Sequence, residues 1–470
     1  MFRLDVARSR AFAFCLTIFC LWLGGSTAVL AQAADAPPAD PAAEEEPADS
    51  FFAETTVTAT GSAIDTFLTP QPVTVIDPLD RPADNAADLL RIEPGVDVNG
   101  VGPNQSRPVI RGQRGLRILF LENGLRMNNA RRQTDFGEIP ALVSLGDVDQ
   151  VEVVRGPASV LYGSDAIGGV LNLVTKRPVL DRPLAGTADV RYSGAGDRAQ
   201  GRLGIAGTAD RWSYSLAYTR RDADDYSAPD GTYGEIELAD SVEVLDTGIE
   251  DSWVDAYLGF LSNDRHEFFA RYSQYRADDA GFGLVDPELL GDAEDFRIRI
   301  LYPFQDFDKI TLGWRGSGLE TPVADTVDWQ VYWQRNEREL VNDIDIDIGP
   351  LFFGAPNSTV ESDTRNLTDL ETFGSRLEVV KVAHADHVLT WGAEFWQDDS
   401  FNTDFSRTVT TLRFPFPPFE VPSVATDSVP NAPNAENRST GVFLQDEWSV
   451  SDRFKVIGGA RFQTVETVAE

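Results

Sequence analysis

Arginine side chains are concentrated in one stretch of this chain, where they could bind an anion or join two parts of the fold by ion pairs. The stretch covers residues 107–132 and contains a single acid, Glu122. Its arginines are Arg107, Arg111, Arg114, Arg117, Arg126, Arg131 and Arg132. Because the whole chain has 75 acidic and 40 basic residues, a net charge of −35, this local positive charge is unusual.

An acidic stretch at residues 222–251 has the opposite character, since it contains many acids and no base. Asp222, Asp224, Asp225 and Asp230 could supply the oxygen ligands that calcium prefers. The alternative, which we favour, is a solvated acidic loop. We therefore expect no cofactor, with calcium in this loop as the one exception.

Residues suited to catalysis or to a zinc site are scarce. The chain has three histidines, His266, His384 and His387, and its two cysteines, Cys15 and Cys20, lie at the N-terminus. No Ser-His-Asp or Cys-His arrangement is recognisable, so we do not expect an enzyme. The strongly negative charge also argues against a nucleic-acid binder, which needs a basic face for phosphates.

The N-terminus is typical of an exported protein. Arginines precede an apolar run from Ala11 to Leu23, and small residues follow it. Since an apolar run of about 13 residues is too short to span a bilayer, residues 1–33 are predicted to be a secretory signal peptide. Residues 34–53, rich in Ala, Pro and acids, are predicted to be a disordered tether.

Two regions of different periodicity follow. Residues 61–180 combine short apolar strands, such as 73–76, with short helical stretches and many Gly and Pro residues. This mixture predicts a compact α+β domain. Residues 181–470 alternate with period two, as at Trp329, Val331 and Trp333, which predicts strands.

The connections between these strands indicate where they lie. Short turns such as 208–210 alternate with long polar loops such as 222–251 and 400–435. An outer-membrane β-barrel sorts its connections in this way, and about eleven strands of suitable length can be counted. A soluble β-sandwich or propeller is the alternative, but it has no reason to sort its connections by length, and no propeller-like repeat is visible.

The stretch from Ala87 to Pro178 resembles the plug domain of TonB-dependent outer-membrane receptors. The most specific part is VEVVRGPASVLYGSDAIGGVLN at residues 151–172, supported by DLLRIEPGV at 88–96 and IRG at 110–112. The resemblance implies an α+β plug domain (61–180) followed by an antiparallel transmembrane β-barrel (181–470). Because such a plug needs a wide barrel, we interpret the chain as truncated, with about half of a 22-strand barrel.

In this family a short box near the mature N-terminus pairs with the energy-transducing TonB protein, and residues 54–60 look like that box. The residues expected to bind TonB are Glu54, Thr55, Thr56, Val57, Thr58 and Ala59. An extended, β-branched segment on a periplasmic tether can add to a partner's sheet edge through main-chain hydrogen bonds. The alternative is an ordinary first strand of the plug.

The resemblance also gives the arginines two roles. Arg111 and Arg155 are expected to pair with Glu394 and Glu447 on the polar faces of barrel strands and so to lock the plug in place. Three further arginines suit either this lock or the binding of an anionic ligand: Arg114, Arg131 and Arg132.

The resemblance implies a monomer in the bacterial outer membrane that contacts lipid, TonB and a small ligand, without nucleic acid. It would import a scarce nutrient, a ferric siderophore first of all, when force on the box displaces the plug. Import of cobalamin or haem is an alternative. A non-transporting surface barrel, such as an adhesin or a passive porin, is the alternative from another class.

Overall fold

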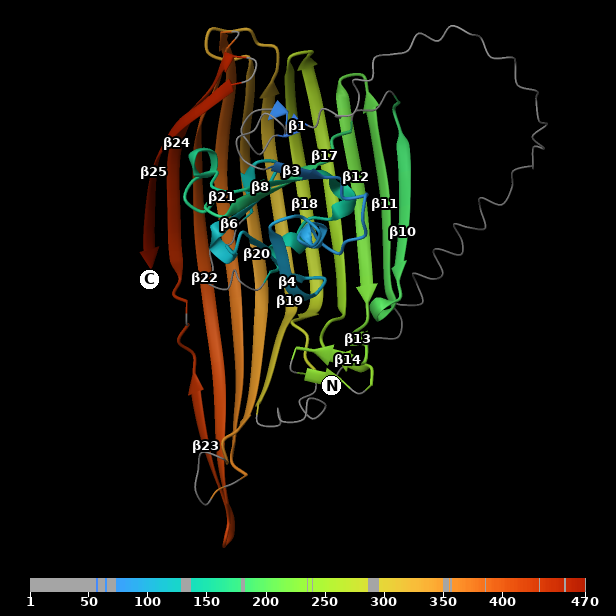
Figure 1. Ribbon diagram of the computed structural model, residues 1–470, viewed down its shortest axis with the longest axis vertical. Helices are drawn as coiled ribbons and strands as arrows, with labels where there is room; N and C mark the ends of the chain where they lie inside the picture. Colours follow the sequence, from blue (N-terminus) through green and yellow to red (C-terminus); the bar gives the residue numbers. More distant parts are fainter. Residues whose placement is uncertain are drawn as a thin grey trace, which may run out of the picture. The chain divides into compact units, whose positions relative to one another are not determined.

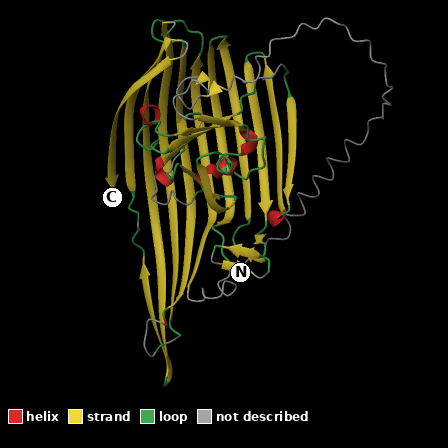
Figure 2. Cartoon of the chain, in the orientation of Figure 1, coloured by secondary structure: helices red, strands yellow, loops and turns green. Residues whose placement is uncertain are grey.

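The computed structural model describes residues 56–57, 64–65 and 73–469, apart from gaps at 128–136, 179–181, 235, 239, 286–295, 350–354, 356, 385, 431 and 452–453. The described residues belong to one compact unit. The predicted signal peptide and tether lie outside them. Figure 2 shows that strands dominate the described residues, and none of the helices found there combines the length and apolarity needed to cross a membrane.

A large antiparallel sheet forms the C-terminal part of the chain (Figure 1). Along its path each strand is hydrogen-bonded to the next one in chain order. These strands are β10 (Ala185–Ser193), β11 (Arg198–Ala209), β12 (Trp212–Ala223), β17 (Ile249–Asn263), β18 (His266–Gly281), β19 (Phe296–Gly316), β20 (Thr326–Asp347), β21 (Thr359–His384), β22 (His387–Pro415), β24 (Ala435–Ser451) and β25 (Phe454–Ala469). A further strand, β23 (Pro418–Asp427), forms a hairpin with β22. This is the antiparallel sheet that the alternating pattern predicts.

The two faces of this sheet have the polarity of a membrane barrel. Lys309 and Gln334 point to the buried face and are 2% and 1% exposed, whereas Leu312 and Trp329 on the same strands are about half exposed. Period-two alternation sends successive side chains to opposite faces. The sheet therefore places polar side chains inward and apolar side chains outward, the arrangement of a transmembrane barrel.

The two ends of the sheet differ. Figure 1 shows β1 (Thr56–Val57) near the end where the short turns lie, with the arrows of β10, β12 and β25 pointing away from it. The opposite end carries the β22–β23 hairpin and two small two-stranded sheets. Those sheets pair β13 (Tyr226–Ala228) with β16 (Val242–Val244) and β14 (Gly231–Tyr233) with β15 (Ile236–Leu238).

The plug, defined here as residues 73–178, lies against the inner face of the large sheet (Figure 1). Its own sheet has the strand order β3-β8-β9-β6-β7, in which β6 and β9 are parallel and the other neighbours antiparallel. The strands are β3 (Val73–Ile76), β6 (Ile118–Glu122), β7 (Leu125–Arg126), β8 (Val148–Arg155) and β9 (Gly169–Thr175). A hairpin of β4 (Val96–Gly102) and β5 (Gln105–Ile110), the short helix α2 (Ser159–Tyr162) and four 3₁₀ turns, η2 (Asp88–Leu90), η3 (Gly115–Arg117), η5 (Ile139–Ala141) and η6 (Leu145–Asp147), surround it.

The glycine that begins β9 has a packing role. Gly169 lies between Arg155 of β8 and Ile118 of β6 in the register of the plug sheet. A Cβ atom added at Gly169 would lie 2.5 Å from the Val154 carbonyl oxygen and 2.9 Å from Ile110 Cδ1. Because a backbone oxygen cannot move away cheaply, this position requires glycine.

We expect Gly169→Ala to destabilise the plug by about 1–3 kcal/mol, because it overpacks the sheet. Gly458→Ala on β25 is the matched control, since an added Cβ there has nothing within 4 Å. Thermal unfolding and protease resistance of the two purified variants measure the difference. Equal stability of both variants would show that β8 and β9 relax around the added methyl group.

Candidate functional site

Ion pairs join the plug to the wall of the large sheet. Four such pairs are found within the described residues, and in each of them the barrel strand supplies the cation and the plug supplies the acid. They are Lys309 with Glu122, Arg338 with Glu138, Arg202 with Asp147 and Arg198 with Asp84. The pairs of Lys309 and Arg338 are almost completely buried, so the pairing of these charges matters most for stability.

The pair between Lys309 and Glu122 is the most completely buried of those with a normal bond length. Lys309 Nζ donates to Glu122 Oε2 at 2.8 Å, and both side chains are 2% exposed. Ser273 Oγ of β18 donates to the other oxygen of the same carboxylate at 3.4 Å. Burial alone would raise the pKa of Glu122, but the positive charges of Lys309 and Arg271 outweigh it and hold that pKa below its ordinary value.

Four barrel arginines share a second arrangement. Each guanidinium is fixed by a carboxylate of the barrel, and one of its remaining N–H groups donates to a plug carbonyl oxygen. Arg221 is fixed by Asp251 and donates to Asp84 O at 2.9 Å, and Arg271 is fixed by Asp255 and donates to Lys176 O at 3.3 Å. Arg376 is fixed by Glu378 and Arg461 by Glu394. Both of these arginines donate to Leu161 O at 3.1 Å. The fork of donors on arginine makes this double role possible.

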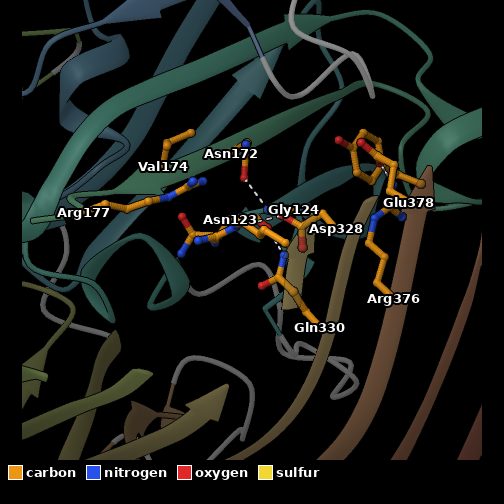
Figure 3. Close-up of a pocket in the computed structure, with 11 residues that line it drawn as sticks. Asn123, Gly124, Asn172, Val174, Arg177, Asp328, Gln330, Arg376 and Glu378 are labelled. Atoms are coloured by element: carbon orange, nitrogen blue, oxygen red, sulfur yellow. Dashed lines mark hydrogen bonds and ion pairs between the residues drawn. The ribbon is translucent and has the colours of Figure 1, made fainter. Parts of the chain in front are cut away.

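A polar cavity of about 130 Å³ lies between the plug and the barrel wall (Figure 3). On the plug side, the Gly124 N–H donates to Asn172 Oδ1 at 3.0 Å, and on the barrel side Gln330 Nε2 donates to the Asn123 carbonyl at 3.3 Å. Arg376 and Glu378 form an ion pair of 2.9 Å at its edge. A space of this size holds waters, whereas pockets for drug-sized ligands measure about 300–1,000 Å³.

Comparison with known proteins identifies both parts of this interface. Residues 65–170 match the family described as TonB-dependent Receptor Plug Domain, and residues 251–469 match the family described as TonB dependent receptor-like, beta-barrel. The chain belongs to the TonB-dependent receptor family. This receptor is accordingly a protein of the Gram-negative outer membrane.

Relatives of the receptor are named for different cargoes. The chain is 30% identical over 200 residues to a vitamin B12 transporter of Photobacterium profundum, covering 40% of this chain and 31% of that protein. It is 37% identical over 150 residues to a hemin receptor of Yersinia pestis, covering 30% of this chain and 20% of that protein.

Solved structures support the fold. The copper transporter OprC superposes with a TM-score of 0.60 at 19% identity, covering 84% of this chain and 55% of OprC. The pyoverdine receptor FpvA of Pseudomonas aeruginosa superposes with a TM-score of 0.60 at 16% identity, covering 88% of this chain and 60% of FpvA. The chain thus spans little more than half the length of these structures and about a third or less of the two relatives named above.

The structure does not bring together the four residues expected to lock the plug of the receptor. Arg155 donates to Pro94 O and to Thr74 Oγ1, both at 2.6 Å and both within the plug, and Arg111 is exposed. Glu394 is used by Arg461 and Arg376 of the barrel, and Glu447 lies 3.4 Å from Lys455 of the barrel. The physical reason is proximity, because Arg376 and Lys455 lie on strands adjacent to those of Glu394 and Glu447, and Arg461 reaches Glu394 from two strands away.

Sequence reasoning missed the cations that do hold the plug. Lys309 and Arg338 stand at inward positions of alternating strands and are 2% and 4% exposed. A basic residue at an inward barrel position was the available signal. The sequence carried no sign of which plug acid would meet each of them.

Several expected site residues lie outside the described residues: Glu54, Thr55, Thr58, Ala59, Arg131 and Arg132. Thr56 and Val57 form β1, which pairs with β2 (Ile64–Asp65) in a short antiparallel ladder. Arg114 immediately precedes η3 on the exposed part of the plug.

The acidic connection between β12 and β17 is folded by its own carboxylates. The Asp225 side chain accepts the backbone N–H groups of Asp246, Thr247 and Gly248 at 3.1, 2.7 and 2.7 Å. Within the part of the chain that the structure describes, no group of three or more His, Cys, Asp or Glu side chains could hold a metal. The suggested calcium ligands Asp222, Asp224, Asp225 and Asp230, all described, therefore do not form a site.

Removing the cation of the buried pair should loosen the plug. We expect Lys309→Met to lower the free energy of local opening around β6 by about 3–5 kcal/mol, because it leaves Glu122 buried and uncompensated. The double variant Lys309→Met/Glu122→Gln should recover most of this loss, and hydrogen exchange of the β6 amides measures both.

Arg220→Gln is the matched control, since its pair with Glu250 is 45% and 59% exposed and should change stability by less than about 0.5 kcal/mol. Because the pKa of Glu122 is lowered in the fold, its contribution is present at neutral pH and is lost only as the pH falls below the ordinary value of 4.5. If Lys309→Met opens no more readily than this control, the buried pair does not hold the plug.

Proposed function

We propose that this receptor imports a scarce nutrient across the outer membrane, and that a ferric siderophore is its cargo. TonB would engage residues 54–60 and supply the work from the proton gradient of the inner membrane. We further propose that residues 1–33 are removed on export and that residues 34–53 form the periplasmic tether. No catalytic reaction is part of this function.

The observation that carries this proposal is the set of buried ion pairs that holds the plug against the barrel wall. With Glu122 and Glu138 both paired to barrel cations, the plug is fastened at several points along its length. The cavity of about 130 Å³ beside it is too small for an iron chelate. Passage at this part of the interface would therefore require the plug to move, and movement against buried ion pairs requires an energy source.

The relatives named above support two other cargoes, cobalamin and haem. The similarity to a vitamin B12 transporter supports cobalamin as the second candidate, and the similarity to a hemin receptor supports haem. Cargo choice depends on loop shape rather than on fold. Siderophore import is placed first because siderophores are frequent cargoes in this family.

Coupling to TonB can be tested at Val57. We expect Val57→Pro to reduce uptake of radiolabelled ferric siderophore to the level of cells without TonB, because proline removes the main-chain N–H needed for strand addition. Val57→Ala is the control and should retain most uptake, since it keeps that N–H. Full uptake by Val57→Pro at normal abundance in the outer membrane would contradict the proposal.

The cargo can be tested by iron starvation. We expect an iron chelator to increase the abundance of this protein in outer-membrane fractions several-fold, as suits a receptor for an iron chelate. Quantitative immunoblotting measures the change, with a constitutive porin as the loading control. Unchanged abundance would contradict siderophore import and move cobalamin to first place.

A further inference from the structure

A second cavity, of about 380 Å³, lies on the large sheet itself and is lined by residues of β19, β20, β21 and β22. These four strands are hydrogen-bonded neighbours in that order (Figure 1). Seven of the eight lining residues are charged, three of them arginines and four of them acids. The volume is in the range of ligand pockets, about 300–1,000 Å³, but such a lining does not suit an apolar ligand. The cavity therefore suits a polar molecule with several charges.

The charges of this cavity are ordered, with arginines at the two sides and acids in the middle. One row lies in direct register across the four strands and consists of Arg299, Asp343, Asp363 and Arg407. A second row, two residues further along the strands, consists of Arg297, Asp345 and Glu361. Because adjacent strands lie about 4.8 Å apart, β19 and β22 are separated by about 14 Å. Their arginines would thus meet two separate groups of a ligand.

Most of these charged side chains have no partner in the protein. Arg299 is the exception among the arginines, since it donates to both carboxylate oxygens of Asp246 at 2.7 and 2.6 Å. In the part of the chain that the structure describes, no hydrogen bond or ion pair engages the side chains of Arg297, Arg407, Asp343, Asp345 and Glu361. Their charges are therefore available to a ligand.

The cavity lies on the outward face of the barrel. The pairing of β20 with β21 runs from Thr326 to Asp347 without a register shift, so the alternation of sides is uninterrupted. Asp343 therefore points to the same side as Trp329, which is 46% exposed on the apolar outer face. Direct pairing in register places the other charged residues of both rows on this side as well.

The cavity also lies beyond the apolar belt of the barrel. The outward residues of β20 are apolar from Val327 to Trp333, and Arg335 is the first charged one. Asp343 follows eight residues later, which places it about 20 Å beyond that boundary at about 3.3 Å per residue and the usual strand tilt. This is the end that carries the β22–β23 hairpin, opposite the short turns, and is therefore extracellular (Figure 1).

Lipopolysaccharide is the molecule that surrounds a barrel at this height, because it forms the outer leaflet of the Gram-negative outer membrane. Its core sugars carry phosphate and carboxylate groups, and divalent cations link these groups to one another. Arginine binds phosphate through two parallel hydrogen bonds. Magnesium is held by one or two carboxylates together with phosphate oxygens of a ligand. Arginines on both sides of a group of acids thus complement two anionic groups with a magnesium ion between them.

We propose that this cavity binds the phosphorylated core of lipopolysaccharide. Arg297 and Arg407 bind two anionic groups of the core, and Asp345 and Glu361, which are paired in register, share a magnesium ion with it. These two carboxylates are too few to hold a metal by themselves, so the phosphate oxygens complete its coordination. The inference does not depend on which cargo the receptor imports.

The role of the arginines can be tested by binding of labelled rough lipopolysaccharide to the purified receptor in detergent with magnesium. We expect Arg297→Gln and Arg407→Gln each to weaken this binding by about fivefold or more, because each loses a charge-assisted contact. Binding of lipid A, which lacks the core, should change by less than about twofold. Arg413→Gln is the matched control on β22, since Arg413 is already bonded to Glu420 and to Asn357 O, and it should leave both affinities unchanged.

Two outcomes of this test would overturn the inference. Equal loss of affinity for rough lipopolysaccharide and for lipid A would place the contact at the lipid rather than at the core. Equal affinities of Arg407→Gln and the control for rough lipopolysaccharide would show that the cavity does not bind it. Retention of the heat-modifiable, folded form on electrophoresis shows that each variant is assembled.

The role of the acids can be tested by removing magnesium with a chelator. We expect chelation to weaken binding of rough lipopolysaccharide to the unaltered receptor by about fivefold or more, because uncompensated carboxylates repel phosphates. Asp345→Asn combined with Glu361→Gln should make the affinity independent of magnesium. A variant that responds to the chelator as strongly as the unaltered receptor would show that these acids do not hold the ion.

Discussion

The structure depends on the pairing of charges that are buried between the plug and the barrel. A transmembrane barrel turns most of its apolar side chains outward, so much of the surface it offers to a plug is polar. Lys309 and Glu122 illustrate the consequence, since neither charge could remain buried without the other. Such pairs hold firmly while water is excluded. Once the plug begins to move and water enters, both charges become hydrated and the attraction weakens, so the same contacts suit a closure that must open repeatedly.

Acidic side chains of the barrel orient the arginines that contact the plug. Asp255 binds two nitrogens of Arg271, and Asp251 does the same for Arg221, which fixes both guanidinium planes. The remaining donors then point at plug carbonyls. Many acids of the barrel thus orient arginines. This explains how a chain with a net charge of −35 can still use cations to hold its plug.

Apolar contact between the plug and the barrel adds to the ion pairs. The β12–β19 wall shares one apolar core with the plug, and Phe443 of β24 belongs to a second one. Each apolar group that becomes exposed when the plug moves costs free energy.

The sequence by itself determined the strands, their inward and outward faces, and the plug. Alternation with period two is a local property, and it placed Trp329 outward and Gln334 inward without any knowledge of the partner strands. The glycine-rich run that ends in β9 reflects a local demand as well, since Gly169 has no room for a Cβ.

Only the tertiary structure decided which charges meet. Glu122 and Lys309 are separated by 187 residues, and Glu138 and Arg338 by 200. Nothing local distinguishes Glu122 from the other 74 acids of the chain, or Glu394, which pairs with Arg376 and Arg461 of the barrel, from an acid free to hold the plug. Partner choice in the lumen depends on how the plug is seated within the barrel, and that seating involves apolar contacts with β12–β19 and with Phe443 of β24 as well as the ion pairs, rather than any residue alone.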